Sequence, residues 1–385
     1  MTDIFYYNII MNGVGIQSSS LAEYDDQRTQ NIINNAGDYL MSVVRFSIDA
    51  SHIPLFVCPV IYDPVTPTNI NNTPYTITLK YNNIDYTRNV QFIPNTKYYF
   101  NLPNAPTING SQDDDSEYYY VWYYSSFLDM VNRTIEKIYN DISNIDHNLQ
   151  NLEIPYFQFD VNSGLISLVV PDIVYGATTD KIYRTQFDIN GNPIISPQPI
   201  NTIQIFCNSR LYHFFDGIPT YLTNSINSVS YRQFLFLITD LHNNTINNKL
   251  VLSQEYQNIG GWNSLSSIVF ITSFLPIQHE YIPNIVDGLV EPGSSYRTTL
   301  TDFVPDVSDK IGSNRGRFHY NPSAQFRMIQ LKSSSSINRI DIKMFWTDKF
   351  NKLHQMRISN GETNSVKLMF VKKNLYFNNF NKQLL

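Results

Sequence analysis

Apolar and polar residues alternate along most of the chain, in short runs separated by Asn, Pro, Gly and Ser. Alternation with a period of two puts apolar side chains on one face of a strand and polar ones on the other, as in Thr76-Ile-Thr-Leu-Lys80. The clearest runs cover residues 39–48, 75–81, 97–102, 164–170, 202–206, 232–238 and 267–273. The pattern predicts a mainly β fold with half-buried antiparallel sheets.

The C-terminal part carries the most regular local pattern. Strand-like runs at 339–346, 353–358 and 365–371 are separated by Asp348–Asn351 and by Asn360-Gly361. Both separators contain residues that tolerate turn conformations, including positive φ. The sequence therefore predicts that a meander of three strands ends the chain.

One segment has a helical period instead. Apolar residues recur every three or four positions at 127, 131, 135, 138, 142, 145, 149 and 152. This spacing predicts one long helix near residues 118–152, with the acidic run Asp113–Asp115 near its start and Pro155 as an upper limit to its end. The apolar stripe is typical of a helix that packs on a sheet, and a coiled-coil seam is the alternative.

The composition indicates a contact-rich, folded protein. Of the 385 residues, 42% are hydrophobic and only 16% are charged, with 27 Tyr and 24 Phe. A surface covered by Asn, Ser, Thr and Tyr suits a protein that packs against neighbours. The net charge of −6 argues against general nucleic-acid binding. Only the end of the chain is basic: Lys367, Lys372, Lys373 and Lys382 follow Val366 with no acidic residue among them, so this tail either meets an anionic neighbour or is solvated.

Reactive chemistry has little support in the sequence. Cys58 and Cys207 each lie in an apolar run and read as small buried hydrophobic residues, which excludes a disulfide framework. The sequence shows no phosphate-binding glycine loop and no pair of histidines at metal-ligand spacing. No signal peptide or membrane-spanning segment is recognised either, and this suggests synthesis in a reducing cytoplasm. We assign no catalytic, cofactor-binding or metal-binding residue and expect no enzyme activity.

The aromatic run Tyr118–Tyr124 is a candidate for ligand contact. Its side chains can pack in a core, anchor an interface or stack on sugars. The acidic run Asp113–Asp115 reads as a solvated turn, with a Ca²⁺ site as the alternative.

Several short sequence segments, spread along nearly the whole chain, together resemble the penton (minor capsid) proteins of virophages and related Polinton-like viruses, closest to the Sputnik type. They lie at Gly37–Ile48, Ile53–Phe56, Phe127–Asn132, Phe206–Tyr212 with Phe215 and Pro219, Gln254–Tyr256, Trp262–Ser264, Ile268–Phe270, Pro276–Pro283, Arg339–Asp341, Trp346–Lys349 and Lys367–Lys373. The resemblance implies a single jelly-roll β-sandwich in a homopentamer at the fivefold vertices of an icosahedral capsid, with an inserted β-rich domain. We assign residues 1–105 and 246–385 to the jelly roll and 106–245 to the insertion, unless the helix belongs to a jelly-roll connection.

The same resemblance implies the partners and the location. The chain is expected to contact copies of itself and neighbouring capsomers of the major capsid protein, in virions assembled in the host cytoplasm. The inserted domain is a candidate for attachment to a host surface glycan or receptor. Two other functions stay open from the residues alone: a carbohydrate-binding β-sandwich module and a β-sandwich glycoside hydrolase.

Overall fold

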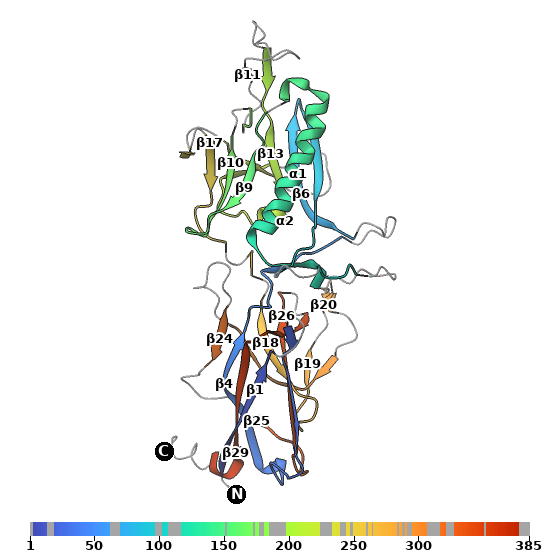
Figure 1. Cartoon of the computed structure of the whole chain (residues 1–385), viewed down its shortest axis with the longest axis vertical. Helices are drawn as coiled ribbons and strands as arrows, with labels where there is room; N and C mark the ends of the chain where they lie inside the picture. The colour runs from blue at the N-terminus through green and yellow to red at the C-terminus, as the bar shows by residue number, and fades with distance from the viewer. Residues whose placement is uncertain are drawn as a thin grey trace. The chain divides into compact units, whose positions relative to one another are not determined.

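The structure, a computed structural model, describes most of the chain. The described residues are 3–13, 19–61, 70–96, 102–106, 117–150, 152–171, 174–176, 181–184, 198–223, 233–238, 244–246, 249–258, 261–263, 265–282, 285–286, 289–290, 295–305, 316–320, 327–349 and 352–376. They divide into two compact units, one of Met1–Pro54 with Ser264–Leu385 and one of Leu55–Asn263 (Figure 1). Unit 2 is therefore an insertion into unit 1.

Unit 1 contains two five-stranded sheets. The first has the order β1 (Ile4–Asn12), β29 (Thr363–Lys372), β4 (Tyr39–Asp49) and β24 (Arg317–Tyr320), with β25 (Ile329–Gln330) also paired to β4. The second has the order β23 (Thr299–Phe303), β18 (Ser267–Ile271), β26 (Arg339–Thr347) and β27 (Leu353–Gln355), with β3 (Glu23–Gln27) also paired to β26. Short pairs join β2 (Ser19–Leu21) to β28 (Arg357–Ser359), β19 (Glu280–Ile282) to β22 (Ser295–Arg297) and β20 (Ile285–Val286) to β21 (Leu289–Val290).

The strand order identifies a jelly roll. If β1, β3, β4, β18, β23, β24, β26 and β29 are numbered first to eighth along the chain, one sheet reads first, eighth, third, sixth and the other reads second, seventh, fourth, fifth. Two antiparallel sheets that exchange strands in this way form the double Greek key of a jelly-roll sandwich. The insertion leaves the sandwich after its third strand and returns before its fourth.

Aromatic side chains join the two sheets of unit 1. The ring of Phe46 on β4 lies 5.3 Å from that of Phe270 on β18 and 4.7 Å from that of Phe303 on β23, measured between centroids. Ile48 and Phe270 are fully buried. Burial of these large apolar surfaces, at about 25 cal/mol per Å², holds the sandwich together.

Unit 2 has its own sheets and a helix. A five-stranded sheet has the order β14 (Thr220–Thr223), β15 (Gln233–Phe236), β13 (Gln204–Asn208), β6 (Asn72–Tyr81) and β7 (Ile84–Gln91), and a four-stranded sheet has the order β16 (Asn244–Ile246), β17 (Lys249–Ser253), β10 (Ile166–Val170) and β9 (Tyr156–Phe159). Two short pairs join β11 (Lys181–Arg184) to β12 (Gln198–Asn201) and β5 (Phe56–Val57) to β8 (Tyr120–Val121). Helix α1 (Tyr124–Ile145) runs alongside β6 in Figure 1 and also contacts β7 and β9, so it links the two sheets. The remaining helices are short: η1 (Ala36–Asp38), η2 (Glu117–Tyr119), η3 (His147–Leu149) and α2 (Ser209–Tyr212).

The predicted strands are largely confirmed, and two details were wrong. Residues 339–347 and 353–355 form the expected hairpin, but β29 crosses to the other sheet and pairs with β1 and β4, so no three-stranded meander forms. The helix is shorter than predicted, because Tyr120–Val121 pairs with β5 and Asp146 ends the helix while its carboxylate accepts a 2.6 Å hydrogen bond from Tyr81. The strand predicted at 97–102 and the acids at 113–115 lie outside the described residues, except for Leu102.

The limits of the insertion differ from the boundaries expected near residues 105 and 246. The hairpin β6–β7 and strand β17, which lie in the segments expected to form the jelly roll, belong to the sheets of unit 2. Helix α1 also belongs to unit 2, in agreement with its expected place in the insertion.

Candidate functional site

An exposed apolar row on β1 is the clearest candidate contact surface of the jelly roll. Strand β1 is an edge strand whose only pairing partner among the described strands is β29. Alternate residues face outward, and Ile4, Tyr6 and Ile10 are 42%, 53% and 60% exposed. We call these three residues the β1 row. A long apolar edge strand invites pairing or packing with another chain unless a partner covers it.

The β1 row continues into a covered apolar cluster on the same outer face. Met369 and Val371 on β29 pack with Val44 on β4, and Met328 and Tyr376 lie against them. Tyr6 and Ile4 stand opposite Met369 and Val371 in the antiparallel register. The outer face of this sheet is therefore apolar at the end that holds Ile4, Tyr6, Met369 and Val371, while Asn8, Ser365 and Lys367 occupy the same face toward Ile10.

Polar contacts close the side of the sandwich where β1 meets β3. The Tyr7 hydroxyl donates to the Asp26 carboxylate at 2.6 Å, and the Arg28 Nε donates to the same oxygen at 2.9 Å. These hydrogen bonds, with Tyr7 contributing most, lower the pKa of Asp26. Burial and the Asp26 carboxylate together raise the pKa of Tyr7. The inner face of β1 is thus fixed to the second sheet, and its outer face and its free edge remain for a partner.

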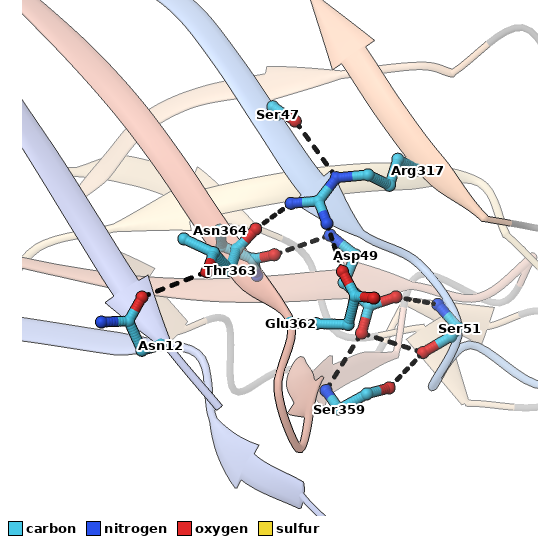
Figure 2. Close-up of polar contacts among 9 residues, drawn as sticks. All are labelled: Asn12, Ser47, Asp49, Ser51, Arg317, Ser359, Glu362, Thr363 and Asn364. Carbon is cyan, nitrogen blue, oxygen red and sulfur yellow. Dashed lines mark hydrogen bonds and ion pairs between the residues drawn. The ribbon is translucent and has the colours of Figure 1, made fainter. Parts of the chain in front are cut away.

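A buried carboxylate holds the end of β4, the strand from which the insertion departs. The Asp49 carboxylate accepts hydrogen bonds from the Ser51 backbone and hydroxyl, both at 2.9 Å, and from the Ser359 backbone at 3.0 Å (Figure 2). Its own backbone N–H donates to Asn364 Oδ1 at 2.6 Å. Burial raises the pKa of Asp49, but the hydrogen bonds from Ser359 and Ser51 outweigh it, so the pKa is lowered.

Arg317 extends this network across the first sheet. Its Nε lies 3.4 Å from Ser47 Oγ on β4, and its guanidinium also donates to the Glu362 carboxylate and to the Thr363 carbonyl (Figure 2). The turn before β29, the start of β24 and the end of β4 are therefore tied together. The network fixes the point where the chain leaves the jelly roll.

The lowered pKa of Asp49 predicts an acid-sensitive jelly roll. The group contributes stability above its unfolded pKa of about 3.9, and this contribution is lost as the pH falls through the lower folded value. We expect the thermal unfolding midpoint of the wild-type protein to fall more steeply below about pH 4 than that of Asp49→Asn, which starts lower at pH 7. The variant Asp38→Asn, which removes an exposed carboxylate of the same unit, should follow the wild type, and parallel curves for wild type and Asp49→Asn would contradict the assignment.

The basic tail is partly engaged within the chain. Lys372 Nζ lies 3.0 Å from Asp3 Oδ1, which raises the pKa of the lysine, and the Lys367 ammonium lies 4.6 Å from the centre of the Tyr6 ring. Lys373 begins the helical turn 373–376 that follows β29, and Lys382 lies outside the described residues. A role of this tail toward an anionic neighbour stays a prediction.

The aromatic run and the cysteines mainly serve the core of unit 2. Tyr118, Tyr119 and Tyr120 are buried, and Tyr124 stacks on Phe159 at 4.3 Å between centroids. Tyr118–Tyr120 and Tyr124 therefore pack internally, whereas Tyr123 of the same run is 40% exposed. Cys58 and Cys207 are buried free thiols whose pKa values burial raises, which confirms their interpretation as small hydrophobic residues.

The described residues contain no cluster of three or more His, Cys, Asp or Glu side chains placed to hold a metal ion. His354 is buried, stacks on Trp346 at 4.1 Å and lies 3.2 Å from the Asp348 carboxylate, as a hydrogen-bonded core histidine does. Over the same part of the chain, the helices lack the combination of length and apolar character that crossing a bilayer requires.

Comparison with known proteins decides the family. The model of the Sputnik minor capsid protein V18/19 family matches residues 4–372. The chain belongs to this family. Its role is accordingly that of a structural component of a virophage capsid and not of an enzyme, which removes the glycoside hydrolase alternative.

Individual relatives agree with the family assignment. The chain is 39% identical to protein V18 of Sputnik virophage over 144 residues, which are 37% of this chain and 85% of that protein. It is 28% identical to structural protein V19 of Sputnik virophage over 183 residues, which are 45% of this chain and 83% of that protein. Each relative thus matches less than half of this chain.

Solved structures confirm the fold. A chain of the Sputnik virophage structure determined by cryo-EM matches with a TM-score of 0.78 and 30% identity, over 98% of this chain and 99% of that one. The mavirus penton protein crystal structure matches with a TM-score of 0.61 and 14% identity, over 96% and 100%. The first match supports the capsid role, and the second shows a shared fold. The expected jelly roll with an inserted β-rich domain and one long helix is confirmed.

Proposed function

We propose that the protein forms homopentamers that occupy the fivefold vertices of an icosahedral virophage capsid. The observation that carries this proposal is the jelly-roll strand order, together with a near-complete match to a chain of the Sputnik virophage particle. The fold is also that of the mavirus penton protein. A jelly roll hides one face of each sheet internally and leaves edges and outer faces for neighbours, so a ring closes by repeating one head-to-tail contact.

The β1 row is the proposed contact in this ring, and its occupant is a second copy of the chain. A head-to-tail contact joins two different surfaces, so the β1 side of one copy meets another side of the next. The opposite side of the sandwich is formed by β23 and β24, whose Phe303 and Tyr320 rings lie 4.2 Å apart. The next residue after β23, Val304, is 79% exposed there and offers an apolar counterpart.

The remaining partners follow from the same role. Capsomers of the major capsid protein are the proposed neighbours around each vertex, with assembly in the host cytoplasm. The inserted unit 2 is the proposed module for host attachment. This proposal is supported by the hydrophobic core of unit 2, which contains residues only from the insertion. Such a unit can carry a separate binding function without altering the sandwich.

The decisive experiment measures the mass of the purified full-length protein in solution and counts subunits per ring by electron microscopy. Five copies per ring are expected. A stable monomer, or rings with another number of copies, would overturn the pentamer, and reconstructed virions whose vertices contain another protein would overturn the vertex position. Binding to glycan arrays without ring formation would instead favour a carbohydrate-binding module.

A further inference from the structure

A polar hollow lies in unit 2 where helix α1 crosses the edge of the five-stranded sheet. Its volume is about 130 Å³, below the roughly 300–1,000 Å³ of sites that enclose drug-sized ligands, so it can take one small group and not a whole oligosaccharide. It is lined by Asn72 on β6, by Arg88, Asn89 and Gln91 on β7, and by Thr134 and Lys137 on α1. Strand β7 is the last strand of its sheet, so the hollow belongs to a sheet edge.

An irregularity in the β6–β7 pairing shapes this hollow. Asn72 pairs with Gln91 and Thr76 pairs with Asn89, so β6 contains more residues than β7 between these two pairs, as in a bulge. Thr73 Oγ1 donates to the Val90 carbonyl at 2.6 Å and holds the extra residues in place. Bulges of this kind redirect side chains and are common beside binding sites.

The amide side chains of the hollow keep part of their hydrogen-bonding capacity. Gln91 Nε2 donates to Asn72 Oδ1 at 2.7 Å, and Asn89 Nδ2 donates to the Thr73 carbonyl at 2.8 Å. Within the described chain, these bonds leave the Gln91 and Asn89 carbonyl oxygens as acceptors and the Asn72 amino group as a donor. A mixture of fixed donors and acceptors matches hydroxyl groups, because each hydroxyl both donates and accepts.

Two cations border the same hollow. Arg88 is held by Asp141 on α1, whose Oδ2 accepts from Nε at 2.9 Å and from Nη2 at 2.7 Å, so Nη1 stays uncommitted in this pair. Lys137 is exposed, and its ammonium makes no hydrogen bond or ion pair to any described residue. One aspartate offsets one of the two positive charges, which leaves the hollow net positive and suited to an anionic group.

We propose that this hollow binds an acidic sugar residue of a glycan. The carboxylate is bound by Lys137 and by the free side of Arg88, while sugar hydroxyls exchange hydrogen bonds with Asn72, Asn89 and Gln91. None of the six lining residues is aromatic, so recognition depends on charge and hydrogen bonds and disfavours neutral sugars that need a stacking platform. This inference rests on the proposed attachment role of unit 2 and names its ligand class.

The test titrates the full-length protein with D-glucuronate and, as a matched neutral probe, with D-glucose, by calorimetry or saturation-transfer NMR. Glucuronate is expected to bind at least roughly tenfold more tightly than glucose, and Lys137→Gln and Arg88→Gln are each expected to weaken glucuronate binding by a similar factor. Arg133→Gln, one turn earlier on α1 and outside the lining, should leave it unchanged.

Equal binding of the two sugars, or glucuronate binding that is unaffected by Lys137→Gln, would overturn the proposal. Lys137 is exposed, so its replacement leaves the fold intact even if the Arg88 variant disturbs the contact with α1. Ring formation is measured on the same preparations. Intact five-membered rings that fail to bind glucuronate would reject this site alone, whereas binding without rings would reject the pentamer and leave the site.

Discussion

The double variant Tyr6→Glu and Ile10→Glu is expected to abolish ring formation and to yield a folded monomer. Ile10→Glu places an unpaired carboxylate in a contact that the wild type makes with apolar side chains, and Tyr6→Glu removes the aromatic ring from the same contact and puts a charge there beside Lys367. Leaving the charge at position 10 buried without a partner costs about 3–5 kcal/mol, so the contact weakens by more than roughly 100-fold. Mass measurement in solution and electron microscopy follow the change.

The matched control is Ile84→Glu, because Ile84 lies on β7, an edge strand of unit 2, and is 56% exposed compared with 60% for Ile10. This control should form rings like the wild type. Rings of unchanged size in the Tyr6→Glu and Ile10→Glu variant would reject the β1 row as the contact. Circular dichroism that matches the wild type ensures that any loss of rings does not come from unfolding.

The second large effect is expected from Phe127→Ala in the core of unit 2. Phe127 is fully buried on α1, and its ring meets those of Phe56 at 5.2 Å, Phe214 at 4.9 Å and Trp262 at 5.6 Å. Removing a buried phenylalanine ring costs about 3–5 kcal/mol, through lost burial and the cavity left behind. Calorimetry of the full-length protein should show an earlier unfolding transition for unit 2, with little change in that of unit 1.

Ile145→Ala provides the comparison on the same helix, since Ile145 is 70% exposed and an exposed substitution usually changes the free energy of unfolding by less than about 0.5 kcal/mol. Comparable shifts for Phe127→Ala and Ile145→Ala would indicate that α1 does not anchor the core. A uniform shift of both transitions after Phe127→Ala would instead contradict the independence of the two units.

Local patterns predicted the strands because alternation is a property of neighbouring residues. Runs such as 39–48 and 267–273 became β4 and β18 with small changes at their ends. The start of the helix was harder to predict than the strands, because the aromatic residues of Tyr118–Tyr124 fit the apolar stripe of a helix and a strand equally well. Pairing of Tyr120–Val121 with β5 decided the question, and this pairing is a tertiary contact that no local pattern contains.

The sheet that each strand joins was also beyond the sequence pattern. The hairpin β6–β7 alternates like the jelly-roll strands, so nothing local separates it from them, and the boundary near residue 105 followed from this similarity. The β1 row was missed for a related reason. Ile4–Asn12 has apolar residues at both odd and even positions, so both faces of the strand contain apolar side chains. Only the three-dimensional arrangement distinguishes the solvent face from the core face.

The Asp49 network left no sequence signal either. Asp49 and Asn364 are 315 positions apart, and an aspartate before a Ser-containing loop is common on protein surfaces. The hollow beside α1 is similar, since it combines a strand irregularity with residues one helical turn apart. In both cases the side chains acquire their role only when distant segments meet.

Strand β29 lies between β1 and β4 and pairs with both. Until β29 has been synthesised, β1 therefore lacks its pairing partner and β4 lacks one of its partners. On the ribosome, Leu55–Asn263 emerges whole and can fold while the surrounding sandwich still lacks its central strand. Closure of the sandwich therefore depends on contacts of high contact order and follows the synthesis of β29, after the insertion can already fold.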